Sequence, residues 1–137
     1  MSMLKIFDTA GTGMTAQSLR LNLVASNMAN VDNVSSSIEQ TYRARHPVFS
    51  ALFNQFNPDD PAVGVGVKGV IESQTALKME YAPNHPLADT DGYIYRSNVD
   101  LAEEMANMIS ASRSYQSNVE VVNSAKQLLS ATLRLGE

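Results

Sequence analysis

All five prolines of this 137-residue chain lie between residues 47 and 86, and the long segments on either side contain none. Proline removes a backbone donor and clashes with the preceding helical turn, so a long helix is excluded from the middle but allowed at both ends. We therefore expect three parts: an N-terminal axial helix within 1–33, a central β-rich segment with loops over 34–98, and a C-terminal axial helix within 99–137. The two terminal parts together would form one core helical domain.

Apolar residues recur at steps of three and four through the N-terminal part, which predicts a helix from Leu4 to about Asn30. The positions of this seam are Leu4, Phe7, Ala10, Met14, Gln17, Leu21, Val24, Met28 and Val31. Gly11 and Gly13 each cost about 1 kcal/mol in a helix interior, which favours a frayed or bent beginning and a firm helix only from near Thr15.

The C-terminal part opens with Asp100 at a helix N-cap position and Glu103 three residues later, the spacing of a capping box. A second seam follows to about Leu135, where Gly136 is placed to end the helix. Its positions are Leu101, Met105, Met108, Ser112, Tyr115, Val119, Val122, Lys126, Leu129 and Leu133. A helix of this extent would be a rod about 50 Å long.

Two helices with the same period can bury their seams against each other if the middle segment brings the chain ends together. We therefore predict an α+β, mainly α, fold in which the long N- and C-terminal helices pair as an antiparallel coiled-coil-like hairpin beside a small central β-rich segment. The intrachain seam is predicted to hold Met14, Leu21, Val24, Met28, Met105, Met108, Val119, Val122 and Leu129.

The middle segment shows strand and turn patterns. Residues 63–71 and 76–81 are rich in β-branched or alternating side chains, and Asp91-Gly92 predicts a turn leading into a short strand at 93–95. Residues 57–61 predict a loop, because the residue before a proline avoids helical angles.

Several large apolar residues fall outside the shared seam, namely Leu19, Leu23, Ile109, Val121 and Leu128. Charged residues make up only 18% of the chain, so these faces lack the ions that normally keep a helix in water. The pattern favours subunit association through these faces. Two alternatives stay open: a monomeric bundle in which the β-rich segment covers the faces, and a non-polymerising helical adaptor or export-related module that grips another protein's helix.

Other classes of function find little support. A net charge of −4 argues against nucleic-acid binding, and no apolar run is long enough to span a membrane or form a signal peptide. The glycine pattern at 64–69 lacks the strand-turn-helix context of a dinucleotide site, and Asp89-Thr-Asp91-Gly92 lacks the later residues of a calcium loop. His46 and His85 each precede a proline and have no evident third metal ligand. We predict no enzyme activity, no catalytic residues, no cofactor and no metal.

Two terminal motifs resemble those of the bacterial flagellar rod, hook and filament-type axial proteins. The first is VASNMANVDNV at residues 24–34, in which Asn27 and Asn30 bracket Met28-Ala29, and the second is EMANMISASRSYQSN at residues 104–118. The middle segment agrees through Tyr42-Arg43-Ala44 and residues 84–89. The resemblance covers essentially the whole chain and implies a structural rod subunit without catalytic activity.

The resemblance also implies a place and partners for the chain. The terminal helices would line the tubular drive shaft that transmits torque, in the periplasmic part of the basal body, after export through the flagellar type III apparatus without a cleaved signal peptide. The implied partners are copies of the chain, other rod proteins (proximal rod subunits and the distal rod protein) and the rod-to-ring adaptor FliE.

Four further residues are candidate subunit contacts beside the apolar ones. Asn27 and Asn30 lie where the last carbonyls of the first helix lack partners, so they either cap that helix or bond to a neighbouring subunit. Arg113 could pair across subunits with Asp32 or Glu103. Tyr115 lies on the seam, where packing within the chain is the alternative.

Overall fold

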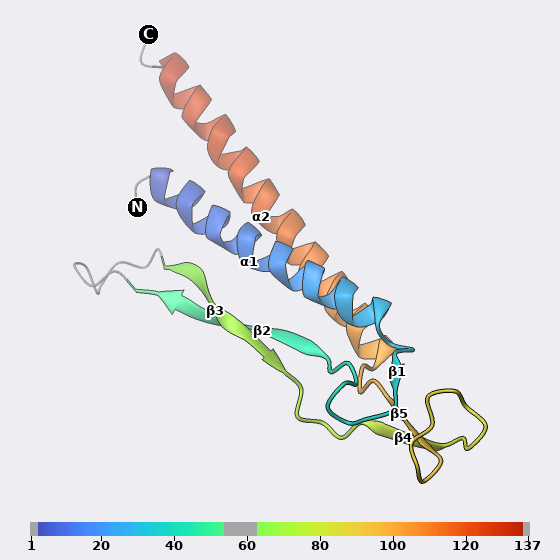
Figure 1. Cartoon of the computed structure of the whole chain (residues 1–137). Helices are drawn as coiled ribbons and strands as arrows, with labels where there is room; N and C mark the ends of the chain where they lie inside the picture. Colours follow the sequence, from blue (N-terminus) through green and yellow to red (C-terminus); the bar gives the residue numbers. More distant parts are fainter. Residues whose placement is uncertain (1–2, 54–62, 136–137) are drawn as a thin grey trace.

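The computed structural model describes residues 3–53 and 63–135. In chain order its elements are α1 (Met3–Ala29), β1 (Val34–Ser35), β2 (Arg45–Leu52), β3 (Gly64–Glu72), β4 (Lys78–Tyr81), β5 (Tyr93–Arg96) and α2 (Leu101–Leu135). The two helices lie side by side and run in opposite directions, so both chain ends are at the same end of the molecule (Figure 1). The predicted fold class, two long paired helices with a small β segment, is confirmed.

Helix α1 begins at Met3 and continues through both glycines, so its regular part starts earlier than Thr15. Gly13 is a point of close approach between the helices, because a Cβ atom there would lie 2.9 Å from Nδ2 of Asn118 on α2. Packing against α2 therefore offsets the poor helix propensity of glycine at this position.

Helix α2 begins as predicted. The Oδ1 atom of Asp100 accepts hydrogen bonds from the backbone N–H groups of Ala102 at 2.9 Å and Glu103 at 3.2 Å, which makes Asp100 the N-cap. The helix continues for 35 residues to Leu135. The predicted role of Gly136 falls outside the described residues.

The buried positions of α2 differ from the predicted seam by one residue. Glu104, Ala111 and Ala125 are the buried residues of this helix, each one position before Met105, Ser112 and Lys126. These buried positions face α1, because α2 contacts no other described helix or strand, and alanine at two of them allows the helices to come close. Met105, predicted for the seam from its spacing, is instead 51% exposed.

Strands β2 and β3 form an antiparallel hairpin that packs along α1 (Figure 1). The backbone N–H of Val65 donates to Oγ1 of Thr12 on α1 at 3.1 Å, and a Cβ atom on Gly64 would lie 3.0 Å from the same Oγ1. The hairpin therefore sits directly on the helix at this point. Strand β2 was not predicted, since only its partner β3 shows a clear strand pattern.

The glycine pattern at 64–69 belongs to strand β3, as its strand-like neighbours indicated. The register shifts between Val48 and Phe49, which pair with Gly69 and Val67, so Lys68 is an extra residue in a β-bulge. A Cβ atom at Gly66 would lie 2.7 Å from Cδ2 of Leu52, so this glycine leaves room for the Leu52 side chain.

A second, three-stranded sheet with the order β1-β5-β4 lies near the end of α1 and the start of α2 (Figure 1). Ile94 on its central strand is 1% exposed and belongs to the core. Gly92 has φ of +82° and makes the predicted turn before β5. The predicted loop at 57–61 lies outside the described residues.

Candidate assembly surface

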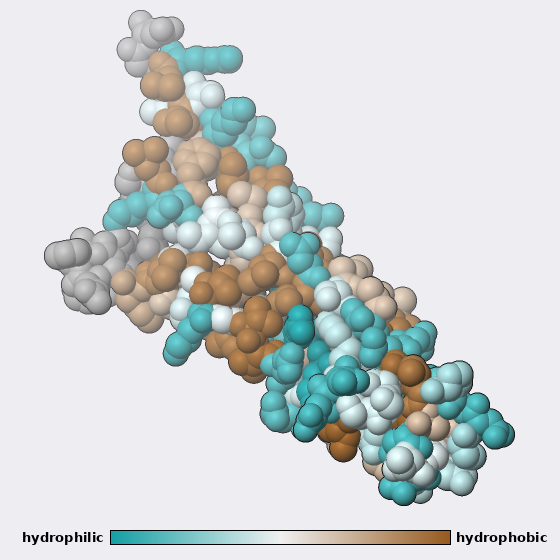
Figure 2. Space-filling view, in the orientation of Figure 1, coloured by the Kyte–Doolittle hydropathy of each residue, from teal (hydrophilic) through white to brown (hydrophobic). Residues whose placement is uncertain are grey.

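Helix α2 contacts only α1 among the helices and strands that the structure describes. Large apolar side chains are exposed from one end of α2 to the other: Leu101, Met105, Ile109, Tyr115, Val121, Leu128, Leu129, Leu133 and Leu135. Figure 2 shows hydrophobic surface near the C-terminal end of this helix and over the β2–β3 hairpin. Burying one such side chain fully is worth roughly 1.5 to 3 kcal/mol, so this surface favours association.

Most of the apolar candidate contacts on α2 lie on this surface. Ile109 is 56%, Val121 44% and Leu128 60% exposed, and Tyr115 is also exposed. Leu19 and Leu23 on α1 are half-buried. The hairpin covers a face of α1 and leaves α2 uncovered, so the alternative of a bundle closed by the β-rich segment does not describe this fold.

The remaining predicted seam residues are less uniform in burial than the pattern implied. Val24 is buried, whereas Leu129 is exposed. The half-buried members are Met14, Leu21, Met28, Met108, Val119 and Val122. The contact between the helices therefore leaves most of the large apolar side chains of the predicted seam only partly buried.

Asn27 forms its hydrogen bonds within its own chain. Its side chain is fully buried. Its Nδ2 donates to the backbone O of Arg45, and its Oδ1 accepts from the N–H of Arg45 and the hydroxyl of Tyr42, each at 2.9 Å. The amide therefore replaces a missing strand neighbour at the start of β2 and ties α1 to the hairpin. These contacts give no support to the predicted subunit contact of Asn27. They could not be foreseen from the sequence, because the partners lie fifteen to eighteen residues away and no local pattern indicates them.

Asn30 follows the capping alternative. Its Nδ2 donates to the backbone O of Ser26 at 2.8 Å, which satisfies one of the last carbonyls of α1. The two asparagines of the motif therefore have different roles, one long-range and one local.

Polar groups at the helix contact were missed by a search for apolar periodicity. Arg20 donates from Nη2 to Oδ1 of Asn107 at 2.8 Å. Glu104 is 2% exposed, and its Oε2 has no hydrogen-bond partner among the described residues, as is also true of Oε1 of Gln17. The place of Glu104 in the first turn of α2 is favourable for a carboxylate, because the N-terminal end of a helix carries partial positive charge.

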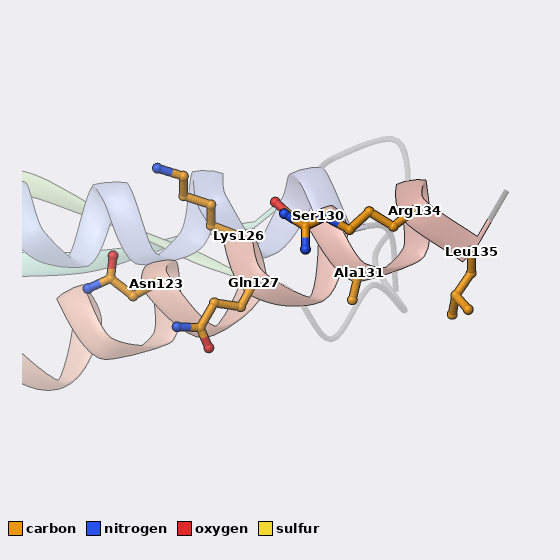
Figure 3. A pocket seen from close by; sticks show the side chains of 7 residues that line it. All are labelled: Asn123, Lys126, Gln127, Ser130, Ala131, Arg134 and Leu135. Carbon is orange, nitrogen blue, oxygen red and sulfur yellow. The ribbon is translucent and has the colours of Figure 1, made fainter. Parts of the chain in front are cut away.

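One hollow lies between the N-terminal half of α1 and the C-terminal half of α2. Its volume is about 410 Å³, and it is lined by Ile6, Ser117, Glu120, Val121, Ser124, Ala125 and Leu128. Small side chains alternate here with apolar ones. The larger hollow of about 790 Å³ is lined by seven residues between 123 and 135, all on α2. Figure 3 shows that its side chains do not converge on one point, since those of Lys126 and Gln127 diverge.

The structure gives no support for chemistry at the acidic loop 89–92. Oδ1 of Asp89 accepts from the backbone N–H groups of Tyr93 at 2.8 Å and Asp91 at 3.0 Å. The bond from Tyr93 is the main reason that the pKa of Asp89 lies below its ordinary value, and partial burial opposes this shift. Burial raises the pKa of Tyr95, whose hydroxyl donates to Asp89 Oδ2 at 3.3 Å. The carboxylate therefore shapes the turn.

No cluster of three metal-ligating side chains occurs within residues 3–53 and 63–135. Over the same residues, neither helix combines the length and the hydrophobicity that a membrane crossing needs.

Comparison with known proteins defines the class to which these paired helices belong. A family described as flagella basal body rod protein matches residues 7–35, and one described as flagellar basal body rod FlgEFG protein C-terminal matches residues 90–135. The matched segments contain nearly all of α1 and α2 together with β1 and β5. The chain belongs to the flagellar basal-body rod protein family, whose members are structural components and not enzymes.

The full-length relatives narrow this class. The chain is 50% identical to flagellar basal-body rod protein FlgC of Escherichia coli O157:H7 and 48% identical to that of Salmonella typhimurium, in each case over the whole of both chains. It is 35% identical to FlgC of Borreliella burgdorferi over 98% of both chains. The chain is thus a structural rod protein of the flagellar basal body, and its family implies assembly with other basal-body components.

Proposed function

We propose that the chain polymerises into the tubular rod of the flagellum through the outer faces of α1 and α2, and that it transmits torque by the packing of these helices. The observation that carries the proposal is the surface of α2 that faces away from α1. No described helix or strand other than α1 contacts α2, and large apolar side chains are exposed along its whole length.

The chemistry of this surface suits burial between subunits. From residue 105 to residue 133 the only charged side chains are Arg113, Glu120 and Lys126. Covering such a surface removes apolar area from water at little cost in ion desolvation. Close-packed interiors have low compressibility, so helices packed in this way would pass a twisting force from one subunit to the next.

We assign different roles to the helical and the β-rich parts of the chain. The helical parts, 1–33 and 99–137, would form the wall of the tube, and the segment 34–98 would lie outside it and contact neighbouring layers. The proposed partners are copies of the chain, other proximal rod subunits, the distal rod protein and FliE. The proposed site is the periplasmic part of the basal body, reached through the flagellar type III export apparatus without cleavage of a signal peptide. The adaptor alternative is set aside, since the relatives are rod proteins.

Replacing Leu128 by Glu tests this function. Leu128 is 60% exposed, so the variant should fold as the parent does, but its charge would have to be buried on assembly. We expect cells whose only copy is L128E to lose motility, and the variant to be missing from isolated basal bodies. The control variant is Ser130→Glu, which places the same charge at an exposed polar position and so measures the effect of charge alone. Normal motility with L128E would contradict the proposed use of this face.

A further inference from the structure

Two surfaces of α2 have matching shapes and lie at different levels of the helix. The first, which we call the ridge, consists of Leu101, Met105, Ile109 and Arg113, at every fourth position of the N-terminal half. All four side chains are exposed. Residues four apart form a continuous row along a helix, and this row is about 18 Å long.

The second surface, which we call the groove, is the hollow beside Ile6 in the C-terminal half of α2. Ser117, Val121 and Ala125 line it, again at every fourth position, and Leu128 closes its far end. From residue 117 to residue 128 the groove extends about 17 Å. A ridge with four-residue spacing packs into a groove with the same spacing, and serine and alanine leave room for large side chains.

The charges of the two surfaces are complementary. Arg113 ends the ridge and Glu120 lines the groove, and both are exposed. Neither forms a hydrogen bond or an ion pair with any residue of the described ranges. On a surface with so few ions, an unpaired cation on one patch and an unpaired anion on the other favour contact between the two patches over contact of either with itself.

We propose that the ridge of one copy packs into the groove of a second copy, with the two α2 helices side by side, pointing in the same direction and offset by about twelve residues. The inference rests on the proposed rod function, because subunits that repeat along one axis point the same way. At this offset Met105 meets Ser117 of the next copy and Ile109 meets its Val121. Arg113 then lies about 7.5 Å along the axis from the level of the neighbour's Glu120. Both side chains lean toward the N-terminus, and the longer arginine side chain extends further in that direction, so the guanidinium approaches the carboxylate.

Such a contact is heterologous, since different patches of the two copies meet. After two copies have joined, one still has a free ridge and the other a free groove. The contact therefore repeats into an open helical array instead of closing as a two-fold dimer. The offset of twelve residues corresponds to an axial step of about 18 Å between contacting copies.

Cysteine cross-linking in basal bodies tests the pairing, because the natural chain has no cysteine. We expect Ile109→Cys and Val121→Cys to give no disulfide-linked product when either is the only copy in the cell, dimers when both are co-expressed, and a ladder of higher products when one chain carries both. Gln116→Cys, an exposed position outside both surfaces, should not cross-link to V121C. Cross-linking of I109C with itself would overturn the proposal, since it indicates a symmetric ridge-to-ridge contact.

Charge reversal gives a second readout. Arg113→Glu or Glu120→Arg alone places like charges together, so each should abolish rod incorporation, whereas co-expression of the two single variants restores an opposite-charge pair at every contact and should restore motility. Failure of the mixture to restore motility would refute the charge pair. If the wild-type chain enters basal bodies but no cysteine pair cross-links, the ridge-and-groove pairing is wrong and the proposed rod function stands. If the wild-type chain is absent from basal bodies, the proposed rod function itself is refuted.

Discussion

Replacement of Asn27 by Ala should be among the most damaging single changes in this chain. The substitution removes three hydrogen bonds of 2.9 Å and leaves the N–H and carbonyl of Arg45 and the hydroxyl of Tyr42 without their partner. A buried group left unpaired costs about 1 to 3 kcal/mol, and some of these groups will find water. We therefore expect the free energy of unfolding to fall by about 3 kcal/mol, which corresponds to a decrease in Tm of about 10 °C for a domain of this size.

Urea unfolding of the purified chain, followed by circular dichroism at the helix band, measures this effect directly. Two neighbouring variants calibrate it. Tyr42→Phe removes one of the three bonds together with the 3.2 Å hydrogen bond between the Tyr42 hydroxyl and Oγ of Ser26, and should cost about 1 to 2 kcal/mol. Asn30→Ala removes only the bond to the backbone O of Ser26 at the end of α1 and should cost about 1 kcal/mol or less. If Asn27→Ala lowers the free energy of unfolding no further than Asn30→Ala does, the role assigned to Asn27 in joining α1 to the hairpin is incorrect.

Two other predictions concern the helix contact and the acidic loop. Gly13→Val should destabilise the chain by about 1 to 3 kcal/mol in the same urea assay, because the valine side chain would meet Asn118. Gly11→Val should have little effect, because nothing lies within 4 Å of a Cβ atom at that position. Equal effects of the two variants would argue against close approach at Gly13. The folded-state pKa of Asp89 is lowered from 3.8, so its contribution to stability is complete above pH 3.8 and is lost as the pH falls through the lower value. Asp89→Asn should therefore remove part of the acid sensitivity of the thermal midpoint, and an unchanged pH profile would contradict this.

The sequence was sufficient for the features that depend on nearby residues. The helix periodicity placed α1 and α2 within a residue or two of their observed bounds, and the spacing of Asp100 and Glu103 placed the start of α2. The Asp91-Gly92 turn and the strand after it were also visible, since a turn is encoded by adjacent residues.

The features that were missed depend on distant residues. Strand β2 has Pro47 near its start and is identified by its pairing with β3, which no local pattern reveals. The seam of α2 is centred on Ala111 and Ala125 because close helix approach favours small side chains, whereas periodicity alone gives more weight to larger residues such as Met105. The exposed face of α2 could be foreseen as an apolar surplus, but its division into the ridge and the groove required the position of α1.

The pairing of α1 with α2 joins the first thirty residues of the chain to the last thirty-five, and the hairpin touches only the first of these helices. Such a contact closes a loop of nearly the whole polypeptide, which makes it slow to form and dependent on both ends being present. A chain that lost its last quarter would keep the α1–hairpin contacts but lose α2, and with it the larger part of the proposed assembly surface. Under the proposed function, a copy truncated before α2 would therefore fail to enter the rod.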